Sequence, residues 1–336
     1  MPPSAESSTI LFDLVRGHGR QKQQLLTVLE SGRIPHALLF TGPSGVGKRQ
    51  IALALAQGLF CSAASGRPCG GCSGCIKSAA SNHPDLLIVD VDPETKSRQI
   101  LLPQIQTLSE ALSRTPGESG RHAVIIDHAD RMSEDAQSAF LKTLEEPMGQ
   151  TFFILITSDL SRLMPTILSR CQTLRFGALG QNDTEDILLK EDGLSPREAT
   201  DYARLSQGSV EEAMLLRDGG YREIADAAFS LALLTLEKHP VAWPDLSSNR
   251  DELLLTADAL VRIYRDVLLL GAARDTNRLF FTDRITELQR LAASIDPDRA
   301  QTILESICIA RDRLLSYVSP RLVSAQLLLD LGLNLF

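Results

Sequence analysis

A strand, a glycine-rich loop and a helix follow one another directly in residues 37–56, and this succession restricts the fold more than any other feature. The apolar run 37–40 predicts the strand, and the run 51–56 predicts the helix. The loop between them has the phosphate-binding pattern and consists of Gly42, Pro43, Ser44, Gly45, Val46, Gly47 and Lys48. Glycines allow backbone N–H groups to surround phosphates, and the lysine can reach the outer ones. The segment therefore predicts an α/β fold of the P-loop type.

Position 49 departs from this pattern. A serine or threonine is expected there, because its hydroxyl ligates Mg²⁺. Arg49 instead carries hydrogen-bond donors and no acceptor, so it cannot coordinate a cation. We therefore expect a site built on an ATPase frame that does not hydrolyse ATP. Two alternatives stay open: the loop binds ATP or ADP without hydrolysing it, or the loop keeps its shape only because its glycines pack.

A second ATPase signature follows the apolar run 124–126. Asp127 ends this predicted strand, at the place where an aspartate of P-loop enzymes holds Mg²⁺. The next residue is His128, where a glutamate would orient the attacking water. A histidine can act as a base, but a surface residue after a strand is the simpler interpretation, and the sequence does not decide between them.

Composition excludes some classes of protein. The chain of 336 residues has a net charge of −8, which does not indicate a dedicated DNA-binding surface, although a local basic patch can exist within an acidic average. It has no apolar run of about 18 residues, the length of a membrane span, and no secretory signal at its start. We expect a cytoplasmic protein without a membrane partner. In such a reducing setting, clustered cysteines indicate a metal before disulfides.

Four cysteines fall within fifteen residues, in a segment rich in glycine and serine. They are Cys61, Cys69, Cys72 and Cys75. This spacing predicts a structural Zn²⁺ site with four thiolate ligands, which leaves no open position for catalysis. The alternatives are free thiols, a disulfide pair, or His83 as a substitute ligand, although His83 is more typical of a turn before a strand. Cys171 and Cys308 are expected to pack in apolar surroundings.

The segment 61–75 could also form a zinc module that binds nucleic acid. It carries a single cation, Arg67, and no aromatic residue. Phosphate attraction and base stacking are both poorly supplied, so this hypothesis is the weakest.

Apolar runs alternate with helical patterns through the first half of the chain, which predicts a parallel sheet with crossover helices. The expected strands are 37–41, 86–91, 123–127, 152–157 and 173–176, with a helix over 133–144. After residue 176 the strand signal stops, and the pattern is helical over 181–217, 251–270, 297–317 and 320–333, with a connection at 239–250. We predict a P-loop domain over 1–177, a small helical domain over 178–219 and an all-helical domain over 220–336.

Several strings together resemble one family, the clamp-loader subunits of bacterial DNA polymerase III, which are AAA+ ATPases. The strings are 34–40, the four-cysteine insert, His83-Pro84-Asp85, 127–130, 139–147 and 165–171, and the most specific parts are Leu141–Pro147 and Ser169-Arg170-Cys171. The detailed match covers about residues 15–215. The resemblance implies an AAA+ domain with a five-stranded parallel sheet, a helical lid and a C-terminal collar. The leucine-rich segments 253–255 and 327–331 fit such a collar, or equally the core of one domain.

The resemblance also implies a function. Family members form a five-subunit ring with tau/gamma and delta subunits, which opens a sliding clamp and places it on primed DNA. In the family, the arginine at the position of Arg170 reaches across the subunit boundary to a neighbour's ATP. The alternative is that Arg170 only pairs with a local carboxylate. An acidic chain suits a subunit that contacts proteins more than DNA.

The subunit type follows from which catalytic features are absent. Arg49, His128 and Glu211 replace a hydroxyl residue, a glutamate and a phosphate-sensing arginine, whereas Thr157 and Ser158 keep hydroxyls at the first sensor position. This combination is similar to the delta-prime type, which hydrolyses no ATP but supplies an arginine to a neighbour. The alternative, an active ATPase of the tau/gamma type, would carry the three replaced residues.

Overall fold

The computed structural model describes residues 11–92, 99–190, 194–237, 249–273, 276–316 and 318–333. Two compact units are present. One comprises the chain up to Ala203 together with Gln207–Glu211, and the other comprises Arg204–Ser206 and the chain from Glu212 onward. The predicted division into three domains stays a prediction.

The first unit is built on a parallel sheet of five strands in the order β2-β3-β4-β1-β5. The strands are β1 (Ala37–Thr41), β2 (Leu86–Val89), β3 (His122–Ile126), β4 (Thr151–Thr157) and β5 (Gln172–Arg175). All five predicted strands are confirmed, with ends that differ by one or two residues. β1 and β3 are buried along their whole length, as expected of strands covered on both faces. The carboxyl ends of these parallel strands lie on one edge, where the candidate site forms.

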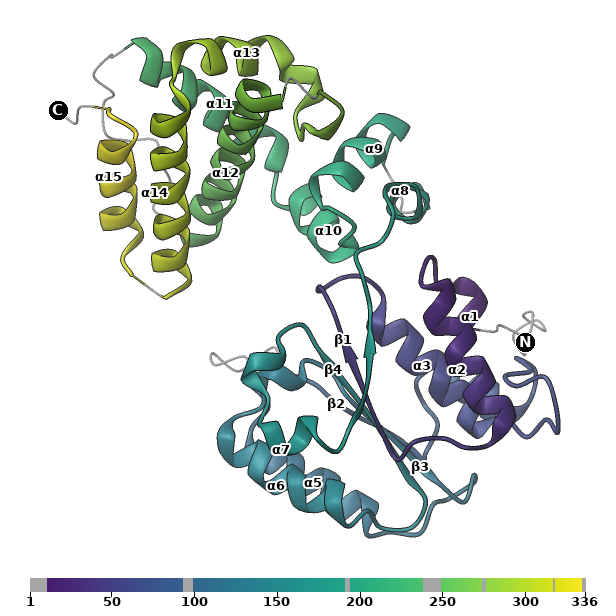
Figure 1. Ribbon diagram of the computed structural model, residues 1–336. Helices are drawn as coiled ribbons and strands as arrows, with labels where there is room; N and C mark the ends of the chain where they lie inside the picture. Colours follow the sequence, from purple (N-terminus) through teal and green to yellow (C-terminus); the bar gives the residue numbers. More distant parts are fainter. Residues whose placement is uncertain are drawn as a thin grey trace, which may run out of the picture. The chain divides into compact units, whose positions relative to one another are not determined.

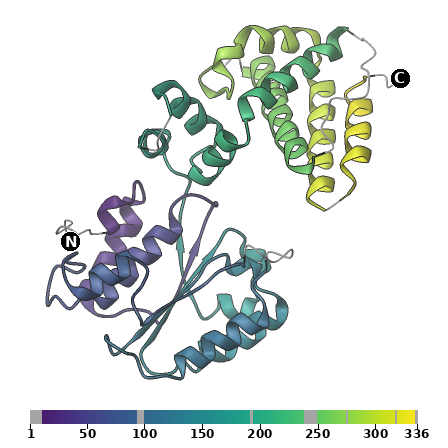
Figure 2. The same cartoon turned by 180° about the vertical axis from the view of Figure 1, so that it is seen from behind.

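Helices cover both faces of the sheet (Figures 1 and 2). On one face lie α1 (Leu11–Leu14), α2 (Gly19–Ser31) and α3 (Lys48–Phe60), and on the other lie α5 (Leu102–Leu112), α6 (Glu134–Glu145) and α7 (Pro165–Leu168). Alternate residues of β1 enter different cores, because successive side chains of a strand point to opposite faces. Phe40 packs with the α2 and α3 side chains, whereas Leu39 packs with those of α5 and α6.

The predicted helix over 133–144 is confirmed as α6. Ser133 caps it, because its side chain accepts a hydrogen bond from the N–H of Ala136. Such a cap stabilises a helix by about 1 kcal/mol. Phe140 and Leu144 are buried on its inner face. The last residue, Glu145, is exposed and therefore available for contacts at the helix end.

Further helices belong to the first unit or contain residues of both units. They are α4 (Ser73–Ala79), α8 (Gln181–Leu188), α9 (Pro196–Leu205) and α10 (Val210–Asp218). The last three confirm the helical pattern predicted over 181–217 within the described residues.

The second unit is helical throughout its described residues. Its α-helices are α11 (Tyr221–Glu237), α12 (Arg250–Ala273), α13 (Ile285–Ser294), α14 (Pro297–Leu315) and α15 (Pro320–Asp330). Ser319 and Pro320 begin α15, as predicted. The predicted connection at 239–250 lies outside the described residues as far as residue 248, and its last residue, Arg250, belongs to α12.

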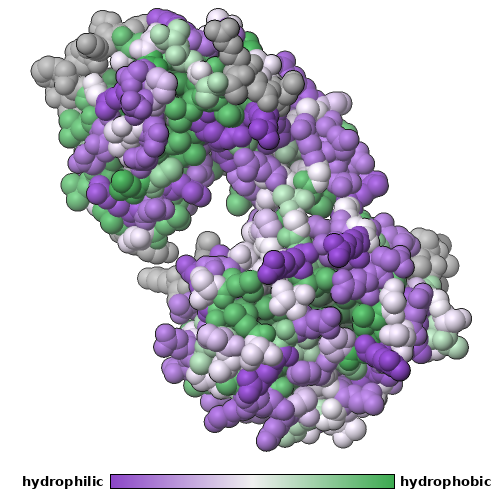
Figure 3. Space-filling model, in the orientation of Figure 1, coloured by the Kyte–Doolittle hydropathy of each residue, from purple (hydrophilic) through white to green (hydrophobic). Residues whose placement is uncertain are grey.

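The C-terminal leucines are divided between core and surface. Leu253, Leu327 and Leu328 are buried, whereas Leu322 and Leu329 are exposed. Apolar side chains are visible on the outside of this unit (Figure 3). The prediction for Cys308 was wrong: the side chain is exposed, although Ile307 beside it is buried. Consecutive residues of a helix point in different directions, so a short apolar string does not place every member in the core.

None of the helices in the described part of the chain combines the length and apolar character needed for a membrane span.

Candidate functional site

The loop that follows β1 approaches other backbone closely at Gly42 and Gly45. Gly42 has φ 150°, and a Cβ there would lie 2.2 Å from the carbonyl oxygen of Phe176. Gly45 has φ 68°, and a Cβ there would lie 2.4 Å from Ser209 Oγ. Side chains at these positions would displace the backbone, so both glycines are required by the fold. The predicted loop therefore forms at the carboxyl end of β1, where α3 begins.

Lys48 turns back onto its own loop. Its Nζ donates hydrogen bonds to the carbonyl oxygens of Gly42, at 2.7 Å, and of Pro43. The side chain is buried, and this burial lowers the pKa of Lys48, although the carboxylate of Asp127 acts in the opposite direction. The ammonium group thus has oxygen partners within the protein.

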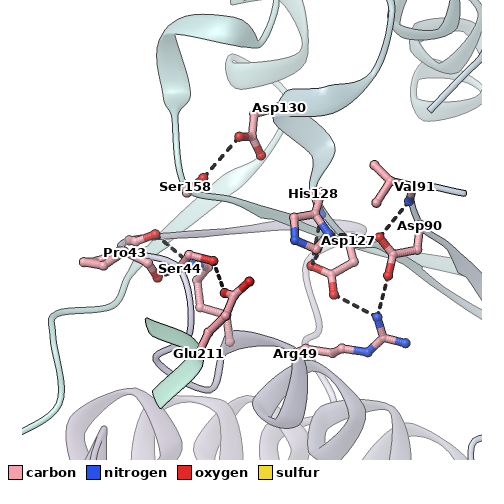
Figure 4. Close-up of polar contacts among 12 residues, drawn as sticks. Pro43, Ser44, Arg49, Asp90, Val91, Asp127, His128, Asp130, Ser158 and Glu211 are labelled. Atoms are coloured by element: carbon pink, nitrogen blue, oxygen red, sulfur yellow. Dashed lines mark hydrogen bonds and ion pairs between the residues drawn. The ribbon is translucent and has the colours of Figure 1, made fainter. Parts of the chain in front are cut away.

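Arg49 joins two carboxylates at the strand ends (Figure 4). Its Nη1 lies 2.7 Å from Asp90 Oδ2 and 3.0 Å from Asp127 Oδ2. Burial acts to lower the pKa of Arg49, but the hydrogen bonds to the two carboxylates raise it overall. The guanidinium occupies the space between acidic groups that could otherwise hold a divalent cation. The structure thus brings together Arg49 and Asp127, which the motif analysis had identified separately.

Asp90 was not identified from the sequence. It directly follows β2, which pairs with β3, so its carboxylate meets that of Asp127 at the same edge of the sheet. An acidic residue at the end of a neighbouring parallel strand was the available signal.

His128 is held by the same carboxylate. Its Nδ1 lies 2.9 Å from Asp90 Oδ1, and its backbone is in the left-handed region, with φ 49°. The hydrogen bond that His128 donates to the Asp90 carboxylate raises the pKa of His128, while burial lowers it to a smaller extent. A raised pKa favours the protonated imidazolium, which cannot accept a proton from water.

Thr157 and Ser158 lie next to the loop but are engaged locally. The carbonyl oxygen of Thr157 accepts a hydrogen bond from the N–H of Gly42, at 3.3 Å. The buried Thr157 hydroxyl donates to the carbonyl oxygen of Asp159 and accepts from its N–H, both at 3.0 Å. Ser158 Oγ lies 3.2 Å from a carboxylate oxygen of Asp130. The two hydroxyls thus stabilise the turn after β4.

Residues 209–211 pack onto the apex of the loop. The hydroxyl of Ser44 donates a hydrogen bond to the carboxylate of Glu211 (Figure 4). The N–H of Val210 donates to the carbonyl oxygen of Gly45, at 2.9 Å. A negative charge therefore lies against the phosphate-binding loop. The family resemblance implied an arginine at this position.

A cavity of about 300 Å³ adjoins the other side of this loop. The cavity is lined by residues of α1, of the loop and the start of α3, of α8 and of the start of α10. Most of these side chains are apolar. They include Val15, Val46, Leu53, Leu179, Ile187 and Val210. This apolar lining suits a flat apolar ring.

Arg170 lies away from this cluster, just after α7. Its Nη2 is 2.6 Å from Glu145 Oε1, and its Nη1 donates to the carbonyl oxygen of Thr166, at 2.9 Å, and more distantly to Ser169 Oγ, at 3.3 Å. The side chain is 37% exposed, so part of the guanidinium faces solvent. The local ion pair that the sequence left as an alternative is present.

The four clustered cysteines converge on one point. Cys61 follows α3, Cys72 caps α4, and all four sulfurs lie within 4.8 Å of one another. Cys69 Sγ and Cys75 Sγ are 4.0 Å apart, close to the roughly 3.8 Å expected between thiolates around tetrahedral zinc with bonds of about 2.3 Å. All six cysteines of the chain are in the described part, and none forms a disulfide. The donor set and spacing fit a zinc ion.

The thiols of this cluster differ in the direction in which their pKa is shifted. Burial alone would raise the pKa of Cys72, but donors from Ser62 and Cys75 lower it to about 6. Burial raises the pKa of Cys75 and of Cys61. A bound cation would favour the thiolate form of all four sulfurs.

The string His83-Pro84-Asp85 has a structural role. His83 stacks on Phe60 with ring centroids 4.0 Å apart, and its carbonyl oxygen accepts a hydrogen bond from the N–H of Leu86, at 3.0 Å, in the turn before β2 that the sequence predicts. Asp85 is buried and accepts hydrogen bonds from the N–H groups of Gly117, Glu118 and Ser119 and from the Ser119 hydroxyl. The string thus fixes the loop before β3.

Comparison with known proteins identifies relatives of the chain. A family model described as DNA polymerase III, delta subunit, matches residues 17–180. The DNA polymerase III subunit delta' of Bacillus subtilis is 32% identical over 307 residues, which cover 89% of this chain and 92% of that protein. The tau subunit of Escherichia coli is 34% identical over 233 residues, which cover 64% of this chain and 35% of that protein.

A solved structure of a gamma subunit-related protein of DNA polymerase III from Thermotoga maritima aligns with a TM-score of 0.44 and 18% identity, covering 92% of this chain and 99% of that chain. The match to the Bacillus subtilis protein is too long to fit within either compact unit, so it includes residues of both.

Proposed function

This chain belongs to the delta' subunits of DNA polymerase III, and we propose that it is a clamp-loader subunit that hydrolyses no ATP itself. In this proposal it assembles with tau/gamma and delta subunits to load a sliding clamp onto primed DNA in the cytoplasm. It also supplies Arg170 to the ATP site of a neighbouring subunit.

The ion pairs of Arg49 carry the proposal that the chain hydrolyses no ATP. Phosphoryl transfer in P-loop enzymes needs Mg²⁺ held between the loop hydroxyl and an acidic residue. Here the hydroxyl is missing, and the guanidinium lies 3.0 Å from the carboxylate of Asp127. A positive charge in that position repels a divalent cation. The raised pKa of His128 further opposes its use as a base.

The exposure and chemistry of Arg170 support its role in trans. A guanidinium that reaches a transferring phosphoryl group from a neighbour accelerates hydrolysis by roughly 10³- to 10⁵-fold in other NTPases. Arg170 uses Nη2 for Glu145 and Nη1 for Thr166 and Ser169. Arginine has five N–H donors, so part of its donor set remains available for a phosphate.

We infer that the cavity beside the loop admits the base of ATP or ADP. Binding would not depend on Mg²⁺, because position 49 offers no ligand for the ion. The phosphates would compete with the Glu211 carboxylate for the Ser44 hydroxyl and the loop N–H groups. Affinity is therefore expected to be modest.

We propose that one Zn²⁺ is held by Cys61, Cys69, Cys72 and Cys75. The ion would neutralise the thiolates and tie the end of α3 to the start of α4. Four protein ligands leave no position for a substrate, so the role of the ion is structural.

The decisive experiment compares the chain alone with the chain in a reconstituted loader. Alone, with Mg²⁺ and ATP, it should release no phosphate, and turnover of about 1 s⁻¹ or more would instead indicate an active ATPase of the tau/gamma type. In the loader, Arg170→Ala should leave assembly intact and lower ATP hydrolysis stimulated by clamp and DNA. An unchanged rate would reject the trans role.

A further inference from the structure

Glu145 contacts the guanidinium of Arg170 from a neighbouring element of the fold. The distance from Arg170 Nη2 to Glu145 Oε1 is 2.6 Å, shorter than the contacts of this side chain with Thr166 O and Ser169 Oγ, and Glu145 is the only charged group among its described partners. The other acceptors, Thr166 O and Ser169 Oγ, belong to the same short segment as Arg170. Glu145 therefore links the arginine to α6.

Glu145 is carried by a well-anchored helix. It is the last residue of α6, directly after the buried Leu144, and this helix is capped at its start by Ser133. The segment that carries Arg170 is anchored by the buried Ile167, which belongs to the same hydrophobic core as Leu144. Both ends of the ion pair are thus fixed to one packed core.

We propose that Glu145 is a positioning residue for Arg170, which holds the guanidinium in the orientation needed at a neighbouring subunit's ATP. This inference rests on the proposed trans role of Arg170. An unrestrained arginine samples many rotamers, and ordering it during catalysis costs conformational entropy. An ion pair that already restricts the side chain reduces this cost. The same advantage is found for any catalytic group that is held in its reactive geometry before the reaction.

The pair does not cancel the positive charge that the trans role needs. The side chains of Arg170 and Glu145 are 37% and 41% exposed, so water screens the attraction between them. The carboxylate engages Nη2 alone and leaves other N–H groups of the guanidinium to a phosphate. The contact thus restricts the orientation of the guanidinium and leaves N–H groups that can donate to a phosphate.

The test uses the reconstituted loader with full-length chains. Glu145→Gln removes the charge, and Glu145→Ala also removes the acceptor. The kcat of clamp- and DNA-stimulated hydrolysis should fall about two- to fivefold, the range of exposed ion pairs, with the larger loss for alanine. KM for ATP should be unchanged, because the guanidinium is proposed to act on the transferring phosphoryl group and not on the binding of ATP. Assembly should be unchanged, because the ion pair lies within one chain.

Glu146→Gln is the matched control. Glu146 is the adjacent exposed carboxylate, and no ion pair joins it to another described residue. The variant Glu146→Gln should leave the kcat of stimulated hydrolysis unchanged. In a chain that already carries Arg170→Ala, Glu145→Gln should have no further effect, because the group that it positions is gone.

The outcomes separate the two proposals. If Arg170→Ala leaves the rate unchanged, the trans role itself is rejected. If Arg170→Ala lowers the rate while both Glu145 variants match wild type or exceed it, the trans role stands and the positioning role of Glu145 is overturned. An equal loss from Glu145→Gln with or without Arg170 would also overturn it.

Discussion

The guanidinium of Arg49 lies against the carboxylate of Asp127, with Nη1 3.0 Å from Oδ2, although the two residues are far apart in the sequence. The same Nη1 lies 2.7 Å from Asp90. A cation of the protein itself is thus present at the carboxyl edge of the sheet, where an ATPase of this fold would hold Mg²⁺.

Replacing Arg49 by threonine is expected to create a dependence on Mg²⁺. The substitution frees the carboxylates of Asp90 and Asp127 and adds a hydroxyl that can ligate the ion. A fluorescent ADP analogue is titrated in Mg²⁺ and in EDTA. The wild-type chain should have the same affinity in both solutions, whereas Arg49→Thr should have a different affinity in each. Arg49→Lys is the control, because it retains a cation. Strong Mg²⁺ dependence in the wild-type chain would contradict the model of the site.

Replacing Glu211 is expected to strengthen nucleotide binding. Glu211→Gln removes a negative charge beside the phosphate-binding loop and weakens the competing bond from Ser44. A hydrogen bond of this kind contributes about 1 kcal/mol, which corresponds to roughly a fivefold change in affinity. Calorimetric titration with ADP measures the difference.

Ser44→Ala is the companion variant for Glu211. It removes the hydroxyl but keeps the carboxylate, so the gain in affinity should be smaller or absent. Equal affinities for wild type and Glu211→Gln would show that this carboxylate does not oppose phosphates.

Removal of zinc is expected to destabilise the first unit. Metal analysis should find about one zinc per chain, and Cys72→Ser should lower both the zinc content and the melting temperature. A strong chelator should have the same effect on the wild-type chain. Cys308→Ser is the matched control, because that thiol is exposed and lies outside the cluster. A metal-free wild-type chain of unchanged stability would exclude the site.

The buried carboxylate of Asp85 is expected to stabilise the fold in a pH-dependent manner. Burial alone would raise the pKa of Asp85, but its donors at 117–119 lower it from 3.8 to about 2. A lowered pKa in the folded state adds stability above the unfolded pKa, and this stability is lost as pH falls through the folded value. Asp85→Asn should therefore cost about 2 kcal/mol at neutral pH.

The measurement is urea unfolding of Asp85→Asn and wild type at several pH values. The difference in unfolding free energy should be constant near neutrality and shrink below about pH 4. Glu110→Gln, on the exposed side of α5, is the control and should change little. A difference that persists at acidic pH would indicate lost packing instead of lost charge.

Much of the fold and part of the site could be predicted from local sequence. The strand before Gly42 and the helix after Gly47 follow from apolar runs and glycine positions, which act over a few residues. The cysteine cluster was predictable because its ligands are close in the sequence. The error at Cys308 arose where a short apolar string was assigned to the core without the direction of each side chain.

The sequence by itself determined the loop, the strands, the cysteines and the unusual residue at position 49. Only the tertiary structure decided what these residues touch: Asp90 and Asp127 for Arg49, Glu211 for Ser44, and Glu145 for Arg170. The physical reason is that local patterns depend on neighbouring residues, whereas these ion pairs join distant segments. Parallel strands with crossover helices and the packing of their cores bring distant segments together: Arg49, Asp90 and Asp127 meet at the carboxyl edge of the sheet, whereas Glu145 and Arg170 meet away from it.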